Sequence, residues 1–341
     1  MKKSNFMKNV ATIVACFAVC LVMSCCDDGK ESGDDDNNGN GGNASSLQTW
    51  TTVEISELEE FNCICFANGK FVAGSLGKVA VSSDNGKTWV VNNNTNWGAN
   101  GVKDIIYDGS RFVAIVGKGI AYTTDPGGTW ARVTLDDDNI GGCNVIAYGG
   151  GYYIAAGRVG DYAYATNPAG PWSYGKIPPV KNDGETVYGI AYGNGKFITG
   201  SMRGKLAYTT GPTETWTILP TLPEEALANG ILYDGSKFVF AASDNLTGYA
   251  TDAAGPWTTK TGPLGYSELE AIAFGKGIYV AAGNSILFTS NPASGWTAVK
   301  ESPFTIFNYA NGVAFGNDTF IAVGGVKGDN EKGLIAYSIV K

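Results

Sequence analysis

The residue types of this chain limit the chemistry that it could perform. Its 341 residues include no histidine, and its arginines are only Arg111, Arg132, Arg158 and Arg203. Without histidine, Ser–His and Cys–His nucleophile systems are excluded and a zinc hydrolase is disfavoured. A glycosidase with two carboxylates about 5–10 Å apart is compatible with the composition, but the sequence singles out no such pair. We therefore predict no catalytic residue, no metal site and no cofactor, and we favour a non-enzymatic role.

A recurring polar position could bind a ligand. It lies four residues before an aromatic residue in each of seven similar segments, and it is filled by Asn62, Lys103, Asn144, Tyr188, Asn229, Glu270 and Asn311. If these segments surround one channel, the seven side chains form a polar collar at its mouth that could hydrogen-bond a sugar or a peptide. The alternative is that asparagine caps strand ends and satisfies loop backbone.

Loops near this collar carry further candidates. Lys78, Lys118, Arg158 and Arg203 form a one-sided set of cations, which is either solvated surface charge or an arc that favours an anionic glycan. Trp97 lies in a polar loop rich in Gly and Asn. Its ring could stack on a sugar or anchor a partner, or it could be a plug packed on the neighbouring sheet.

An internal repeat predicts the elements that position these residues. Seven tryptophans recur at intervals of 39 to 44 residues, at Trp50, Trp89, Trp130, Trp172, Trp216, Trp257 and Trp296. Between them, four short apolar or alternating segments return, separated by Gly, Asn and Asp. Four antiparallel strands in about forty residues make one β-propeller blade. We therefore predict an all-β, seven-bladed β-propeller over residues 47–341, with strands A to D in each blade.

The two ends of the repeat predict how the ring closes. The seventh unit, residues 311–341, has strands A, B and C but no tryptophan strand, whereas residues 49–53 around Trp50 form a D strand with no blade before it. The N-terminal strand is therefore expected to complete the last blade, which removes two exposed sheet edges. The D–A and B–C loops then share one face, called the top face below, which carries the candidate ligand residues.

Two C–D turns show a family resemblance. Ser82-x-Asp84-x-Gly86-x-Thr88-Trp89 and Thr123-x-Asp125-x-Gly127-x-Thr129-Trp130 resemble the Asp-boxes of bacterial neuraminidase repeats. The resemblance implies a sialidase-like propeller in which Asp accepts turn N–H groups, Gly permits positive φ and Trp fills the gap between blades. It also implies that these boxes are structural and lie opposite the ligand face. The catalytic set of sialidases is missing, because there is no Arg-Ile-Pro phrase and only two top-face arginines are left for the arginine triad.

The N-terminal segment predicts a lipid anchor. Three lysines precede an apolar run over residues 10–23, which fits a signal peptide over residues 1–24 and is short for a transmembrane helix. The run ends in Leu-Val-Met-Ser-Cys, which resembles a bacterial lipobox and implies lipidation of Cys25. Residues 25–46 are acidic and nearly devoid of apolar side chains, so we expect a disordered tether. The acids after Cys25 resemble the export signal of Bacteroidota surface lipoproteins, which implies a surface-exposed, lipid-anchored location at the outer membrane.

Charge and cysteine content narrow the partners. A formal net charge of −8 disfavours nucleic-acid binding, which needs a basic footprint. We expect small, buried, hydrophobic roles for Cys63, Cys65 and Cys143. We also expect the protein to be a monomer that contacts the membrane only through its lipid. The leading hypothesis is a non-catalytic module that binds a glycan or a surface protein. The alternatives are a divergent glycoside hydrolase and a structural subunit of an envelope assembly.

Overall fold

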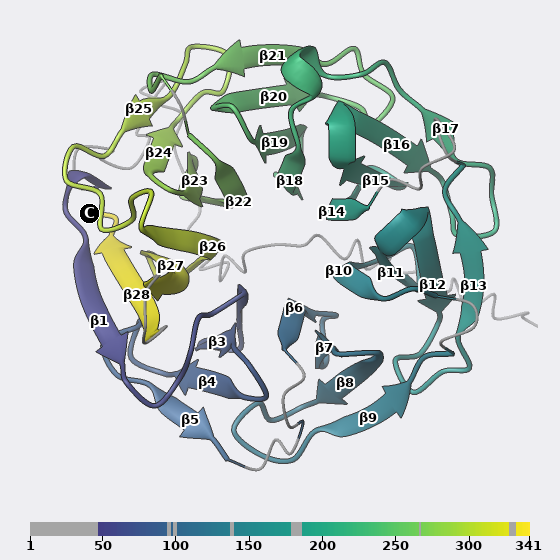
Figure 1. The fold of residues 1–341 in the computed structure, drawn as a ribbon, viewed down its shortest axis with the longest axis horizontal. Coiled ribbons are helices and arrows are strands. Elements are labelled where there is room, and N and C mark those ends of the chain that lie inside the picture. The colour runs from purple at the N-terminus through teal and green to yellow at the C-terminus, as the bar shows by residue number, and fades with distance from the viewer. Residues whose placement is uncertain are drawn as a thin grey trace, which may run out of the picture.

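The chain forms a closed ring of seven β-sheets. The computed structural model describes residues 47–93, 97, 101–136, 140–178, 186–265, 267–326 and 332–341. In this part of the chain, seven four-stranded antiparallel sheets surround a central channel (Figure 1). The predicted all-β, seven-bladed propeller is confirmed. The expected signal peptide, Cys25 and tether lie outside the described residues.

Each blade has its strands in the order A to D from the channel to the rim. The A strands are β2 (Cys63–Ala67), β6 (Val102–Tyr107), β10 (Cys143–Gly149), β14 (Val187–Gly193), β18 (Ala228–Tyr233), β22 (Leu269–Gly275) and β26 (Asn308–Gly316). The B strands are β3 (Lys70–Gly74), β7 (Phe112–Val116), β11 (Tyr152–Gly157), β15 (Lys196–Ser201), β19 (Phe238–Ala242), β23 (Ile278–Gly283) and β27 (Thr319–Val326).

The D strand at the rim is the shortest strand of each blade. The C strands are β4 (Val79–Ser82), β8 (Gly119–Thr123), β12 (Asp161–Ala165), β16 (Lys205–Thr209), β20 (Leu246–Ala250), β24 (Ile286–Thr289) and β28 (Lys332–Ile339). The D strands are β5 (Val90–Asn92), β9 (Ala131–Thr134), β13 (Ser173–Lys176), β17 (Thr217–Ile218), β21 (Thr258–Thr261), β25 (Thr297–Ala298) and β1 (Thr51–Ile55). Three short 3-10 turns interrupt top-face loops, namely η2 (Arg158–Gly160), η3 (Met202–Gly204) and η4 (Pro223–Glu225).

The N-terminal strand closes the ring as predicted. β1 pairs antiparallel with β28, with Thr51 opposite Tyr337 and Ile55 opposite Gly333. The sheet order β1-β28-β27-β26 therefore joins the two ends of the chain in one blade. Just before β1, the Trp50 Nε1–H donates to the Leu47 carbonyl (2.9 Å), and Leu47 is fully buried.

Aromatic side chains join the inner strands within and between blades. In every blade the aromatic residue of strand A packs against the aromatic residue five positions later, in strand B, with ring centroids 4.4 to 5.1 Å apart. In four blades the residue after the strand A aromatic is glycine, which leaves room for the next blade, and in blade one it is Ala67. A Cβ at Gly193 would lie 2.2 Å from the Tyr233 ring, and one at Gly275 would lie 2.0 Å from the Phe315 ring.

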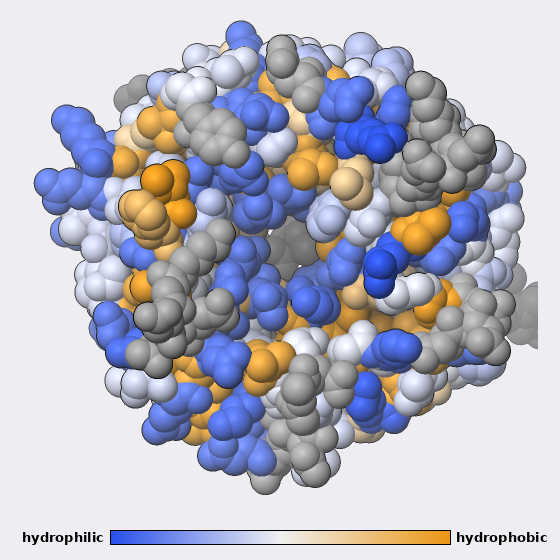
Figure 2. Space-filling model, in the orientation of Figure 1, coloured by the Kyte–Doolittle hydropathy of each residue, from blue (hydrophilic) through white to orange (hydrophobic). Residues whose placement is uncertain are grey.

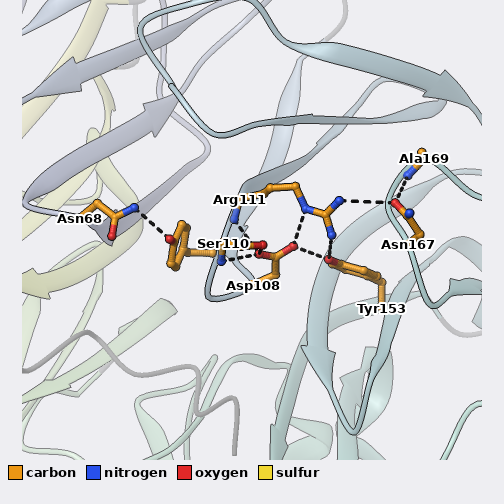
Figure 3. A network of polar contacts seen from close by, with 8 residues as sticks. Asn68, Asp108, Ser110, Arg111, Tyr153, Asn167 and Ala169 are labelled. Atoms are coloured by element: carbon orange, nitrogen blue, oxygen red, sulfur yellow. Dashed lines mark hydrogen bonds and ion pairs between the residues drawn. The ribbon is translucent and has the colours of Figure 1, made fainter. Parts of the chain in front are cut away.

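Two blades replace that glycine with a buried aspartate and gain a polar contact to the next blade. Asp108 accepts hydrogen bonds from the Ser110 and Arg111 N–H groups (2.8 and 2.6 Å), from the Arg111 Nε–H (3.0 Å) and from the Tyr153 hydroxyl of blade three (Figure 3). Such charge-assisted bonds offset the cost of burying a carboxylate.

The same arrangement recurs between blades five and six. Asp234 accepts bonds from Ser236, Lys237 and the Tyr279 hydroxyl. Burial alone would raise the pKa of Asp234, but the bonds from Tyr279 and Lys237 outweigh burial and lower it to about 2. Tyr153 and Tyr279 are the two tyrosines at a strand B position that is otherwise phenylalanine, so each Asp–Tyr pair is matched across a blade junction.

Removing the closing strand should destroy cooperative folding. Deletion of residues 47–54 leaves β28 with an unpaired edge, so we expect the single thermal transition to be lost and the protein to aggregate. Scanning calorimetry and light scattering of the full chain measure both effects. Deletion of residues 36–43 in the predicted tether is the length-matched control. A 47–54 deletion that melts like the full chain would contradict the closure.

The Asp234–Tyr279 pair should stabilise the fold above acidic pH. Because the pKa of Asp234 is depressed in the folded state, its contribution is complete above about pH 4 and is lost as the pH falls toward about 2. Tyr279→Phe should therefore cost about 1–2 kcal/mol of unfolding free energy at neutral pH and less near pH 2. Tyr249→Phe is the control, because the Tyr249 hydroxyl makes no hydrogen bond to any described residue. An equal cost of Tyr279→Phe at both pH values would refute this role.

Candidate functional site

The top face combines a polar centre with apolar loops. Figure 2 shows hydrophilic residues around the mouth of the central channel and hydrophobic patches among the surrounding loops. Three groups of side chains on this face could contact a ligand. They are the collar residues, the B–C loop cations and the exposed apolar side chains.

The collar residues occupy β-bulges. The register of strands A and B shifts at the collar position in six blades, at Lys103, Asn144, Tyr188, Asn229, Glu270 and Asn311. In the first blade, Asn62 directly precedes β2. A bulge adds one unpaired residue and re-aims its side chain out of the ladder. The sequence therefore located the ring of polar positions, although it did not indicate that the residues are bulged.

The four collar asparagines join neighbouring blades. The Nδ2 groups of Asn62, Asn144, Asn229 and Asn311 donate to the carbonyls of Val102 (2.9 Å), Val187 (3.2 Å), Leu269 (3.3 Å) and Phe61 (2.9 Å). Each carbonyl belongs to the residue just before the collar position of the next blade. Asn311 also donates to the Glu60 carboxylate (2.6 Å). These amides satisfy backbone at the blade junctions, which corresponds to the backbone-capping interpretation of the collar.

Asp104 joins blades two and three in another way. Its carboxylate accepts hydrogen bonds from its neighbour Ile105 N–H (2.8 Å) and from Ile146 N–H of the next blade (2.9 Å). Burial raises the pKa of Asp104 to about 6, although these two bonds oppose the shift. The sequence analysis missed this residue. The signal in the sequence was the acid itself, because the residue directly after the collar residue is Cys, Val, Gly, Gly, Ala and Gly in the other blades.

Trp97 is packed and is not offered to a ligand. Its side chain is 5% exposed, and its ring lies edge-on to Trp130 with centroids 5.6 Å apart. Of the two interpretations of Trp97, the packing plug on blade two matches this placement, and the stacking platform does not. The aromatic contact within the core explains why a tryptophan stands outside the 39–44 residue repeat, and we leave Trp97 out of the candidate site.

The C–D turns hold their aspartates in local hydrogen bonds. Asp84 accepts from the Thr88 N–H (2.9 Å) and hydroxyl (2.6 Å), and Gly86 has a φ of +82°. In the second turn, Asp125 accepts from the Gly127 N–H (3.2 Å). The expectation of positive φ was wrong at Gly127, whose φ is not positive. The Trp89 and Trp130 Nε1–H groups donate to turn carbonyls, so both turns are internally bonded.

The exposed apolar residues gather on the top face. Among the described residues, eight large hydrophobic side chains are exposed, and six of them belong to top-face loops or to the collar: Leu76, Val159, Tyr188, Met202, Ile306 and Phe307. The other two, Val90 and Ile339, lie in outer strands. Clustered exposed apolar surface marks interaction sites more often than scattered single residues do.

Blades three and four bring several of these residues together. η2 packs against β14, and one shallow pocket is lined by Val159, Ile177, Pro178, Val187 and Ile218, with Ser201 and Lys205 also at its wall. Around it stand exposed side chains from η2, η3 and the collar. We call Arg158, Val159, Tyr188, Met202 and Arg203 the blade 3–4 patch.

Two residues of this patch have strained backbone. Val159 has a φ of 60° and Arg203 a φ of 58°, in the left-handed region that favours glycine. A β-branched residue there costs about 1–3 kcal/mol and persists only where surrounding structure or function requires it. Val159 is 42% exposed, so burial of its side chain offsets only part of this strain.

The arginines of the patch are uncommitted within the described structure. Both Arg158 and Arg203 are exposed, and neither side chain makes a hydrogen bond or ion pair to a described residue. Nearby, Lys205 donates to the Thr221 hydroxyl and Lys176 pairs with Asp161 (3.2 Å).

Lys78 and Lys118 lie on the B–C loops of blades one and two, so the predicted placement of the four cations on successive B–C loops is confirmed.

Metal-binding groups and reactive thiols are two features that could support catalysis. The described residues contain no group of three or more His, Cys, Asp or Glu side chains placed to hold a metal ion. Cys63, Cys65 and Cys143 are free, and burial raises the pKa of Cys63 well above its usual value and that of Cys143 to about 12. These two thiols are therefore protonated and weakly nucleophilic at neutral pH.

No helix in the described part of the chain is long and apolar enough to span a membrane.

Comparisons with known proteins show which solved structures share the fold of this chain. No protein-family model and no curated protein matches the sequence. Among solved structures, YCF48 from Cyanidioschyzon merolae is 14% identical with a TM-score of 0.65, and the match covers 85% of this chain and 98% of that one. The structure of YCF48 bound to a D1 peptide is 13% identical with a TM-score of 0.64, covering 86% and 97%.

An enzyme shares the same fold. A catalytically inactive virginiamycin B lyase from Staphylococcus aureus, with quinupristin, is 15% identical with a TM-score of 0.65, and the match covers 84% of this chain and 98% of that one. At such identities these similarities show the β-propeller fold alone. Because the fold is shared by a lyase and by a peptide-bound protein, it does not decide the function.

Asp104 should make stability fall with rising pH. Because its pKa is raised in the folded state, the folded protein binds this proton more tightly than the unfolded chain does between about pH 4 and 6. Asp104→Asn cannot titrate, so between about pH 4 and 7 the wild type should lose about 1–3 kcal/mol relative to the variant. Urea unfolding of both proteins at the two pH values measures this difference. A stability difference that does not change with pH would disprove the assignment.

Proposed function

We propose that this chain is a non-catalytic binding protein whose top face holds a segment of a partner protein. The observation that carries the proposal is the concentration of exposed large hydrophobic residues on that face, six of the eight in the described structure. Interaction surfaces of proteins are enriched in aromatic residues, methionine and arginine. Tyr188, Met202, Arg158, Arg203 and Phe307 match this composition.

The same composition favours a protein over a glycan. Two of the predicted glycan contacts are engaged within the fold, because Trp97 is buried and the collar asparagines bond to backbone. The aliphatic side chains of Leu76, Val159 and Ile306 gain more from covering by another apolar surface. A YCF48 propeller has been solved with a peptide bound, which supports the feasibility of peptide binding by this fold.

We further propose that the propeller is tethered to the cell surface. The support is in the sequence, namely the signal-like residues 1–24, the lipobox-like phrase before Cys25 and the acidic segment 25–46. The two C–D turns with Asp84 and Asp125 support a distant relationship to Asp-box propellers. On this proposal the protein is a surface lipoprotein of the outer membrane, and its partner is a protein of the envelope or of the surroundings.

Selection from a peptide library tests the proposal. A phage library of random twelve-residue peptides is panned on the immobilised full chain, and we expect enriched peptides that bind in solution. Binding should weaken about tenfold or more when top-face apolar residues are replaced by serine, and it should survive Val90→Ser and Ile339→Ser in the outer strands. Failure to enrich any peptide, together with binding to a polysaccharide array, would overturn the proposal in favour of a glycan.

A further inference from the structure

We infer that the blade 3–4 patch binds an acidic peptide segment that carries an apolar anchor residue. This inference rests on the proposed function and adds the location of the site and the chemistry of its partner. It is supported by three independent features of blades three and four, which are the apolar pocket, the two uncommitted arginines and the strained loops that present them.

The pocket between the blades supplies the anchor site. Its apolar wall comes from several separate segments, which include Val159 in η2, Ile177 and Pro178 after β13, and Val187 at the start of β14. Ile218 of β17 completes that wall, and the exposed Tyr188 follows Val187 directly. The pocket is small, and the exposed side chains of Val159, Tyr188 and Met202 beside it extend the apolar surface on which an anchor residue can pack, as anchor residues do at protein interfaces.

The charges around the pocket specify the rest of the segment. Arg158 and Arg203 stand on successive blades, and Lys205 lies at the pocket wall. Among the described acids near the pocket, Asp161 already pairs with Lys176, and Glu225 belongs to η4, which packs against η3. On a chain with a net charge of −8, the two uncommitted arginines are locally complementary to carboxylates. Arginine forms bidentate bonds with carboxylates, which gives such contacts direction.

The backbone of the loops presents these groups outward. η2 and η3 occupy the same B–C position in neighbouring blades, and each places a non-glycine residue in the left-handed region before a glycine. Glycine at either place would relieve the strain, yet the sequence has Val159 and Arg203, the types that an apolar and acidic partner requires. Strain retained at exposed side chains is consistent with a functional requirement for those side chains.

Fluorescence anisotropy with a defined probe tests the inference. The probe is a fluorescein-labelled octapeptide, Asp-Glu-Asp-Leu-Phe-Asp-Glu-Asp, titrated with the full chain. We expect saturable binding that weakens when sodium chloride is raised from about 50 to 500 mM, because exposed charges are screened. Replacing Leu-Phe with Ser-Ser, or the acids with lysine, should weaken binding about tenfold or more.

Matched variants locate the site. The double variant Arg158→Glu, Arg203→Glu and the double variant Val159→Asn, Met202→Ser should each weaken binding about tenfold or more. Val159→Asn should keep the melting temperature, because asparagine tolerates positive φ. Val90→Ser with Ile339→Ser changes exposed apolar residues outside the top face, so it should leave the affinity unchanged.

The outcomes separate this inference from the proposed function. Library peptides that bind the top face while the acidic probe does not bind would overturn the inference and leave the proposed function standing. Equal binding of the acidic and the lysine-containing probes would also overturn it, as would full affinity in the Arg158→Glu, Arg203→Glu variant with an unchanged melting temperature.

Discussion

The whole structure depends on how closely the seven inner strands approach one another around the channel. Adjacent A strands belong to different sheets, so no ladder joins them and their junctions need small residues and side-chain bonds. A Cβ at Gly189 would lie 2.6 Å from the Asn229 carbonyl oxygen, and one at Gly230 would lie 2.8 Å from the Ala271 backbone. The asparagine bonds to the next blade, and the Asp104 bond to Ile146, fasten the same junctions. The polar collar is therefore first a part of the closure of the ring.

Contacts among the inner strands and the A–B turns stabilise the fold. The top-face loops are therefore available for the proposed binding role. The Asp–Tyr pairs that join neighbouring blades, and the aromatic contacts within each blade, involve the strands and the A–B turns. The B–C loops of blades three and four contribute strained backbone and exposed apolar and cationic side chains instead. Strain and exposure are unfavourable for folding, and their combination at Val159 and Arg203 agrees with a proposed binding role that is separate from the scaffold.

The architecture could be predicted from the sequence because each propeller blade is specified by residues that are close together in the chain. Tryptophan spacing, turn residues and the unpaired strand around Trp50 determined the blade count and the closure without knowledge of distant contacts. The binding side was less predictable. The bulges that re-aim the collar asparagines, the path that buries Trp97 against Trp130, and the Ile146 N–H that Asp104 meets all depend on a neighbouring blade. The loop conformation at Gly127 likewise differs from what the Asp-box resemblance implied.

The central claim is that recognition takes place on the blade 3–4 patch rather than at the collar asparagines or the C–D turns. Hydrogen–deuterium exchange of the full chain, with and without a saturating peptide selected from the library, tests it most directly. The account predicts new protection of the amides in η2, η3 and the start of β14, with the C–D turns around Asp84 and Asp125 unchanged. Protection confined to the C–D turns, or to blades distant from η2 and η3, would contradict it.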